Sequence, residues 1–130
     1  MTTIVVSAAL VERHGRLLVT RRLPGVHLAG CWEFPGGKCE AGETLDACLR
    51  RELREELDVD AEVGPEVFSV VHDYEGRRVE LHFFRCDLRG EPAAQLGQEL
   101  AWTPCADLDE DRFPPADAEL VRRLRQSAGR

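Results

Sequence analysis

The sequence predicts an α/β or α+β sandwich, in which strands precede and follow a central helix and a second helix closes the chain. Two observations predict it. Short apolar, β-branched segments are separated by glycine turns, and leucines recur every four residues through the middle of the chain. The chain has 130 residues, of which 43% are hydrophobic and 32% charged. We therefore expect one folded domain over residues 1–130.

The first elements expected are two strands and a long loop. Residues 4–11 are apolar and partly β-branched, as in a buried strand, and His14-Gly15 supplies a turn before a returning strand over residues 16–22. Residues 23–42 contain two prolines and five glycines, which indicates a loop held in place by its aromatic side chains.

A helix is expected over residues 44–57. Thr44 can cap its first turn, Asp46 suits the positive end of the helix dipole, and the leucines form one buried stripe. The turn Glu75-Gly76 then predicts a second hairpin, which a short strand and a last helix with a basic end follow. The expected ranges are residues 66–74, 77–88 and 100–103 for the strands and 117–126 for the last helix.

Charge and composition exclude several classes of protein. Acidic residues outnumber basic ones by 24 to 17, so we expect no nucleic-acid polymer as partner, because such binding needs a positive face. The apolar runs are too short for a membrane span, and the N-terminal segment has the pattern of a strand rather than a leader. Five cysteines without a CxxC pair predict reduced thiols and a cytoplasmic protein, with neither a disulfide framework nor a zinc site.

Three glutamates of the expected helix share one face, since Glu52, Glu55 and Glu56 are spaced i, i+3 and i+4. One interpretation is a solvated acidic face, although three like charges there cost helix stability. The other is a binding site, because this face borders the leucine stripe and follows a Gly36-Gly37 turn whose backbone can approach a ligand closely. Carboxylates and a backbone carbonyl are the ligands that Mg²⁺ prefers, and Mg²⁺ commonly bridges them to phosphates.

The pattern around this helix closely resembles the Nudix box, a long motif with fixed spacing. Gly37 is followed after five residues by Glu43, and after seven more by residues 51–56 (RELREE). Further segments resemble the MutT-like branch of that family and occur in the same order, so the resemblance covers nearly the whole chain. These segments are residues 20–22 (TRR), 32–38 (WEFPGGK) and 113–117 (FPPAD).

The resemblance implies the Nudix fold, a mixed β-sheet sandwiched between helices, and Mg²⁺-dependent hydrolysis of a nucleoside triphosphate to the monophosphate and pyrophosphate, with Mn²⁺ as an alternative cation. Such a metal polarises phosphoryl oxygens, activates water and offsets the charge of the triphosphate. Glu43 and Arg51 would form a structural ion pair between loop and helix. The implied metal ligands and catalytic groups are Glu52, Glu55 and Glu56, with the Gly36 carbonyl completing the metal site.

The resemblance also implies a base pocket between the first strand, the aromatic loop and the last helix. Lys38 and the arginines at positions 21 and 22 are candidates for phosphate contacts, and Phe34 is a candidate for stacking on the base. Asp117 can read the base, cap the last helix, or do both. The full set of implied substrate-binding residues is Arg22, His27, Glu33, Phe34, Pro35, Gly36, Lys38 and Asp117.

Asp117 is the residue that says most about the base. Relatives that act on 8-oxoguanine nucleotides carry asparagine there, which both donates and accepts, whereas an ionised aspartate only accepts. An ionised Asp117 suits an amine such as N4 of cytosine or an N–H edge of oxidised guanine, and a buried, protonated one regains a donor. The leading expectation is a MutT-type enzyme for oxidised nucleotides such as 8-oxo-dGTP, acting in nucleotide pool sanitation and DNA repair. The alternative is a CTP or modified-pyrimidine triphosphate pyrophosphatase.

Two positions depart from the family pattern. Asp58 replaces a glycine after the glutamates, and aspartate tolerates a left-handed helix end better than most residues. Leu96 stands where MutT-like relatives often carry a glutamate that serves as a ligand or base, with Glu99 as a candidate substitute. Leu96 favours an alternative of another class, a nucleotide sensor without turnover, which the intact helix glutamates oppose. The sequence leaves both a monomer and a dimer open.

Overall fold

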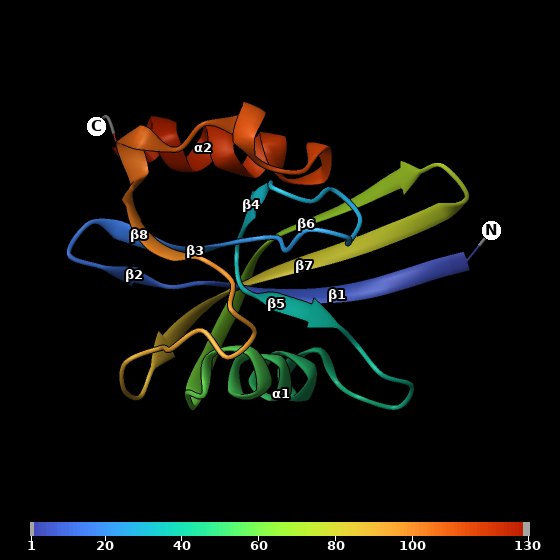
Figure 1. The fold of residues 1–130 in the computed structure, drawn as a ribbon, viewed down its shortest axis with the longest axis horizontal. Helices are drawn as coiled ribbons and strands as arrows, with labels where there is room; N and C mark the ends of the chain where they lie inside the picture. The colour runs from blue at the N-terminus through green and yellow to red at the C-terminus, as the bar shows by residue number, and fades with distance from the viewer. Residues whose placement is uncertain (1, 129–130) are drawn as a thin grey trace.

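The computed structural model describes residues 2–128 and has two helices on opposite sides of a central β-structure (Figure 1). Helix α1 (Leu45–Leu57) lies below the strands in this view, and α2 (Ala118–Ala128) lies above them. This arrangement is the α+β sandwich expected from the sequence. Single turns of 3-10 helix lead into α2, namely η1 (Cys105–Asp107), η2 (Glu110–Arg112) and η3 (Pro115–Asp117).

The first sheet is mixed and has the strand order β5-β1-β7-β6. Strand β1 (Thr2–Leu10) runs parallel to β7 (Arg77–Leu88), and antiparallel to β5 (Gly36–Lys38) on its other side. Strand β6 (Ala61–Tyr74) pairs antiparallel with β7 as the second expected hairpin. The parallel pair therefore joins the N-terminal strand to a segment about seventy residues away and carries the short β5 beside it.

The second sheet is built around β3 (Arg16–Arg21), which pairs antiparallel with three other strands. His14 and Gly15 both have positive φ, 54° and 76°, as a tight hairpin turn requires, so the turn expected from the sequence is confirmed. The partners of β3 are β2 (Glu12–Arg13), β4 (Trp32–Glu33) and β8 (Leu100–Pro104).

Two expectations about strands are wrong. Residues 23–42 are not loop throughout, because they contain β4 and β5, and the glycines of β5 are held by pairing with β1 rather than by their own propensity. Strand β6 begins at Ala61 instead of residue 66. It continues through Gly64 and Pro65 by shifts of register against β7, which is how a strand accommodates residues that would otherwise end it.

The core forms two apolar clusters, one under each helix, because side chains of β3 alternate between the faces of their sheet. Leu17 and Val19 face α2, whereas Leu18 faces α1. The three leucines that α1 buries completely, at positions 49, 53 and 57, each contribute roughly 1.5–3 kcal/mol through the hydrophobic effect. This anchoring fixes the rotation of α1, and with it the direction of its glutamates.

Both ends of α1 are as expected. The Thr44 hydroxyl accepts a hydrogen bond from the Ala47 N–H at 3.1 Å, and Asp58 ends the helix in the left-handed region at φ 51°. Within residues 2–128 no helix combines the length and apolar character needed to cross a membrane. All five cysteines are free thiols.

Candidate active site

Helix α1 presents Glu52 and Glu56 one turn apart at the edge of the apolar core. The Glu52 side chain is only 13% exposed, and Glu56 is half-buried. Burial, followed by the negative charge of Glu52, raises the pKa of Glu56 to about 8. The charges that act on Glu56 are those of Glu52, Glu33 and Glu55, so this part of the site carries unbalanced negative charge.

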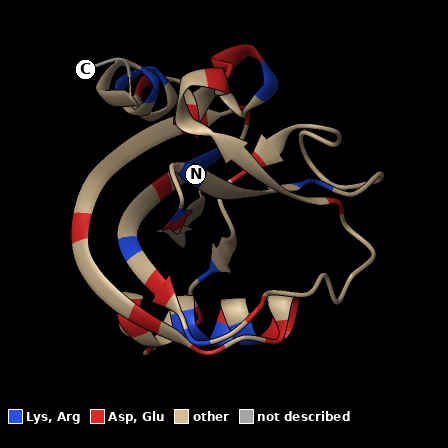
Figure 2. Cartoon of the chain, turned by 90° about the vertical axis from the view of Figure 1, so that its left-hand side faces the viewer, with Lys and Arg blue, Asp and Glu red and all other residues tan. Residues whose placement is uncertain are grey.

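Arg51 holds the other end of the acidic face. Its guanidinium donates two hydrogen bonds to Glu43, at 2.7 and 2.8 Å, and one each to Glu52 (2.9 Å) and Glu55 (3.2 Å). A fifth bond reaches the carbonyl of Lys38 at 3.0 Å. The bond from Arg51 holds the pKa of Glu43 at about 2. The expected ion pair therefore ties the loop before α1 to the helix, and the same arginine orients Glu52. Figure 2 shows these acidic and basic bands along α1.

Gly36 and Gly37 of β5 each allow a close contact, one with the neighbouring strand β1 and the other with helix α1. A Cβ atom at Gly37 would lie 2.3 Å from the carboxyl carbon of Glu52, so only glycine leaves room for that side chain. A Cβ at Gly36 would lie 2.1 Å from the carbonyl oxygen of Ser7 in β1. Gly36 therefore permits the pairing of β5 with β1, and Gly37 permits the position of Glu52.

The donor set suits a hard divalent cation. Within residues 2–128, no group of three His, Cys, Asp or Glu side chains is arranged to hold a metal ion as it stands, and the Glu55 carboxylate is turned towards Arg51. The neighbouring carboxyl groups of Glu52 and Glu56, however, offer the oxygen ligands that Mg²⁺ prefers, and a bound cation would offset the burial and the like charges that disfavour ionisation of Glu56. The residues therefore fit a cation at this end.

A second polar group lies near the N-terminal end of α2 and contains residues from four separate segments. Arg22, next after β3, donates one hydrogen bond to the Glu33 carboxylate at 2.7 Å and another to the His27 carbonyl at 2.6 Å. Burial raises the pKa of Glu33 despite this arginine. The negative charge of Glu33 also contributes to the raised pKa of both Glu56 and Asp117.

Asp117 is buried, with 3% exposure, and within the described residues its Oδ1 atom has no hydrogen-bond partner. Burial, and then the charge of Glu33, raise its pKa to about 7, while Arg22 acts in the opposite direction. Asp117 is the last residue of η3 and directly precedes α2, and within residues 2–128 its Oδ1 atom caps no N–H group of that helix. Capping of α2 by Asp117 stays a prediction. An unpartnered carboxyl beside a polar cluster is suited to meet a ligand.

Phe34 does not have the position that base stacking requires. It is 4% exposed and lies in the core, with its ring centroid 5.2 Å from that of Phe113 and 6.1 Å from that of Phe83. Stacking of a base on this ring is therefore excluded by burial, and only the backbone of this segment is left for a ligand. Pro35 is also buried, and its carbonyl accepts a bond from the Ala9 N–H at 2.8 Å.

The other expected contacts are at the surface. The side chain of Lys38 is exposed, as is His27, which lies in the loop between β3 and β4. Arg21, a candidate for phosphate binding, pairs with the carboxylate of Glu99 at 3.3 Å. Glu99 is therefore engaged with an arginine, and its role as a substitute base remains a prediction.

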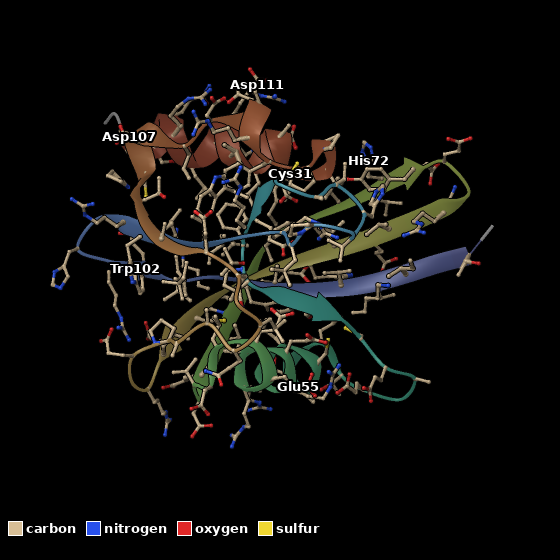
Figure 3. The ribbon with its side chains drawn as sticks, in the orientation of Figure 1. Cys31, Glu55, His72, Trp102, Asp107 and Asp111 are labelled. Carbon is tan, nitrogen blue, oxygen red and sulfur yellow. The ribbon has the colours of Figure 1, made fainter. Side chains whose placement is uncertain are left out.

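The structure adds Tyr74 and His72 of β6 to the polar group around Asp117. The Tyr74 hydroxyl accepts a hydrogen bond from the Ala116 N–H at 3.4 Å, and its ring lies 5.0 Å from His27 and 4.5 Å from His72. Figure 3 shows His72 on the side of the sheet that faces α2. The alternation of residues 68, 70, 72 and 74 along β6 places them on one face, and this was the available sequence signal.

The loop after β7 contacts the last turn of α1. The carbonyl of Glu56 accepts hydrogen bonds from the Gln95 N–H at 2.9 Å and from Gln98 Nε2 at 3.2 Å. Leu96 lies between these residues and is 55% exposed. Gln98 thus supports the backbone of Glu56, although sequence reasoning did not single it out.

A hollow of about 390 Å³ lies apart from the helix glutamates. It is lined by Val19 and Trp32 of the second sheet and by the segment from Asp107 to Phe113. None of the helix glutamates lines it.

Comparison with known proteins identifies the family. The model of the NUDIX domain matches residues 6–123. The CTP pyrophosphohydrolase of Escherichia coli is 39% identical over 92% of this chain and 88% of its own length. The 8-oxo-dGTP diphosphatase of Haemophilus influenzae is 37% identical over 93% and 90%. The solution structure of the E. coli ORF135 protein superposes with a TM-score of 0.84 at 37% identity, covering 100% of this chain and 94% of the other. The chain belongs to the NUDIX family and has the fold of its MutT-like members.

Proposed function

We propose that this protein hydrolyses nucleoside triphosphates to the monophosphate and pyrophosphate, with oxidised nucleotides such as 8-oxo-dGTP as substrates. The observation that carries the proposal is that one domain holds both the Glu52–Glu56 face of α1, which Arg51 orients, and the Arg22–Glu33 pair with the buried Asp117. The Glu52–Glu56 face has the carboxyl groups to bind a cation and, through it, phosphates. The Arg22–Glu33–Asp117 group has buried polar side chains that can form hydrogen bonds with a base. Relatives of similar length are named for this activity.

Glu52, Glu56 and, after leaving Arg51, Glu55 are the residues that would hold Mg²⁺ or Mn²⁺, with the Gly36 carbonyl. When bound, the cation polarises phosphoryl oxygens, lowers the pKa of water and offsets the charge of the triphosphate. Arg51 keeps the Glu52 carboxylate oriented through its 2.9 Å bond. With its pKa raised to about 8, the Glu56 carboxyl is largely protonated at neutral pH, and a cation bound beside it would favour its ionised form.

At the other end, the chain's own groups would orient the nucleoside. Arg22 and Glu33, joined by a hydrogen bond of 2.7 Å, would form one polar side of the site, and Asp117 offers a carboxyl oxygen that has no hydrogen-bond partner within residues 2–128. Lys38 is exposed close to the loop that Arg51 holds, where a phosphate chain could extend from the base end. We place such activity in the cytoplasm, where hydrolysis of oxidised triphosphates keeps them from DNA synthesis and so supports DNA repair.

CTP or a modified pyrimidine triphosphate is the second candidate substrate, and Asp117 is the observation that favours it. An ionised carboxylate only accepts hydrogen bonds and so suits an exocyclic amine such as N4 of cytosine. An asparagine amide both donates and accepts, and therefore discriminates less sharply between an amine and a carbonyl on the base. The relative at 39% identity is named CTP pyrophosphohydrolase.

Pyrophosphate release from a panel of nucleotides tests the proposal. We expect turnover of 8-oxo-dGTP, dGTP, CTP or dCTP in the presence of Mg²⁺, and loss of turnover when the metal is chelated with EDTA and its return when Mg²⁺ is added back. Release of orthophosphate instead of pyrophosphate, or nucleotide binding without any turnover, would contradict the proposal. The ranking of kcat/KM within the panel decides between the two substrate classes.

A further inference from the structure

Two cysteines occupy the contact between β5 and α1. Cys48 is completely buried in the first turn of α1, and its thiol donates a hydrogen bond to the carbonyl of Gly37 at 3.6 Å. Cys39 directly follows β5 and is half-buried. The Cys39 N–H donates to the carbonyl of Val5 at 2.8 Å, so the chain at Cys39 continues the pairing of β5 with β1.

The register of strand on helix brings the two thiols together. Side chains two residues apart on a strand share a face, so Cys39 points in the same direction as Gly37, whose Cβ position lies against Glu52 of α1. Residues four apart on a helix also share a face, so Cys48 lies one turn before Glu52. The strand runs opposite to the helix, and the pair Cys39–Cys48 is therefore next to the pair Gly37–Glu52. Ser7 of β1, which pairs with Gly37, donates a hydrogen bond from its hydroxyl to the carbonyl of Leu45 in α1, so its side chain also points towards that helix.

We propose that Cys39 and Cys48 are an oxidation site of this protein, at which hydrogen peroxide produces a disulfide that staples β5 to α1. Helix α1 already packs against β5 in the reduced protein, where the Cys48 thiol reaches the Gly37 carbonyl, so we expect the bond to need rotation of side chains rather than a new arrangement of the chain. The other three cysteines are at positions 31, 86 and 105, on different elements.

The chemistry balances with peroxide as the oxidant. The sulfur of Cys39, which solvent can reach, attacks peroxide and becomes a sulfenic acid, and one water is released. The sulfur of Cys48 then attacks the Cys39 sulfur. The S–S bond forms as the S–O bond breaks, and the departing hydroxide takes the Cys48 proton as a second water. Burial, and then the hydrogen bond with Cys39, raise the pKa of Cys48 to about 12, which is consistent with Cys39 as the first thiol attacked.

Peptide mapping of the oxidised protein tests the proposal directly. The whole protein is treated with hydrogen peroxide, its remaining thiols are alkylated after unfolding, and the disulfide is located by mass. Trypsin leaves both cysteines in residues 39–50, whereas cleavage after Glu40 or Glu43 separates them. We expect the tryptic peptide to be two hydrogens lighter and unalkylated, and its two fragments to stay joined until a reductant is added. Cys86 should remain alkylatable.

Thermal unfolding provides a second readout. A short closed loop restricts the unfolded chain, so peroxide should raise Tm by about 5 °C or more, and dithiothreitol should reverse the rise. The half-buried Cys39→Ser variant should lose the rise, and the matched Cys31→Ser variant, also at a half-buried thiol, should keep it. The proposal is overturned if Cys48 stays alkylatable while Cys39 gains two or three oxygens, if another cysteine is joined instead, or if Cys39→Ser keeps the rise in Tm.

Discussion

The acidic face of α1 and the polar group around Asp117 are built in opposite ways. Glu52, Glu55 and Glu56 belong to one helix and one contiguous motif, and a single arginine next to them in the sequence orients the face. The group around Asp117 takes its members from the residue after β3 and from β4, β6 and η3, which the fold alone brings together. Periodicity therefore locates the first region, whereas tertiary packing determines the second.

The two regions also differ in how their charge is balanced. On α1 like charges face one another, and at Glu56 the nearby groups all disfavour its ionisation. Around Asp117 one arginine, one glutamate and one buried carboxyl act on each other with opposite signs. A region of uniform charge is suited to bind a cation, whereas a region of mixed donors and acceptors is suited to discriminate between bases. Substitutions can test this division.

The largest effect should follow from Glu56→Gln. This change removes one negative charge from the acidic face and should lower kcat for pyrophosphate release at least ~100-fold, the range for loss of one preorganised electrostatic group. Tm should not fall, because repulsion with Glu52 is relieved. The exposed Glu75→Gln, in the turn between β6 and β7, is the matched control and should leave kcat unchanged. Near-normal turnover in the Glu56 variant would remove this face from the reaction.

Adjacent glycines should separate folding from activity. In Gly36→Ala the new methyl meets the backbone of Ser7, which cannot move without breaking β5 from β1, so we expect a loss of roughly 1–3 kcal/mol in unfolding free energy. In Gly37→Ala it meets the carboxyl end of Glu52, which can rotate away. That variant should keep its stability and lose about tenfold in kcat/KM, because Glu52, a proposed metal ligand, is displaced. Denaturant unfolding and steady-state kinetics of both variants decide this, and equal losses of stability would contradict it.

The helix could be predicted closely because its signals are local. Thr44, the leucine stripe and Asp58 specify where α1 begins, which face is buried and where it ends, and the structure agrees at each point. The short strand β5 could not be predicted in the same way. Its residues are two glycines and a lysine, and it is a strand only because β1 and the parallel β7 lie beside it.

The site shows the same limit. The shared face of the helix glutamates follows from their spacing and the Glu43–Arg51 pair from the resemblance to the Nudix box, whereas the burial of Phe34 follows from neither. An aromatic side chain in a glycine-rich loop looks equally suited to stacking or to the core, and only the packing with Phe113 decides. Tyr74 was missed because its contact with Ala116 joins residues 42 positions apart in the sequence.

Asp117→Asn should change substrate preference by about tenfold. The substitution keeps size and alters only donors and acceptors, and a bidentate base contact is worth roughly 1–3 kcal/mol of discrimination. With its pKa near 7, Asp117 is partly protonated at neutral pH and increasingly an acceptor above it. The Asp117→Asn variant should therefore have a higher ratio of kcat/KM for 8-oxo-dGTP to kcat/KM for CTP than the wild type, and this difference should be larger at pH 8.5 than at pH 6. If all four nucleotides of the panel scale equally at every pH, the base is selected elsewhere.

The smallest effect should be a pH-dependent difference in stability between the same variant and the wild type. Folding raises the pKa of Asp117 from its ordinary value of 3.8 to about 7, because burial and Glu33 disfavour its charge more than Arg22 favours it. Well below pH 3.8 the carboxyl is neutral in both the folded and the unfolded state. As pH rises towards 7, the unfolded chain loses this proton while the folded protein keeps it, so the wild type loses stability across this range and no further above it.

Asp117→Asn cannot ionise and should escape that loss. Its Tm minus that of the wild type should rise by a few degrees between pH 4.5 and 7 and then level off. The absolute Tm of the variant is less informative, because the amide also changes the hydrogen bonding available to a buried group. Asp111→Asn, at an exposed site in η2, is the control and should run parallel to the wild type. Parallel curves for Asp117→Asn as well would mean that this carboxyl is ionised throughout and reads its ligand only as an acceptor, which would favour the pyrimidine substrates.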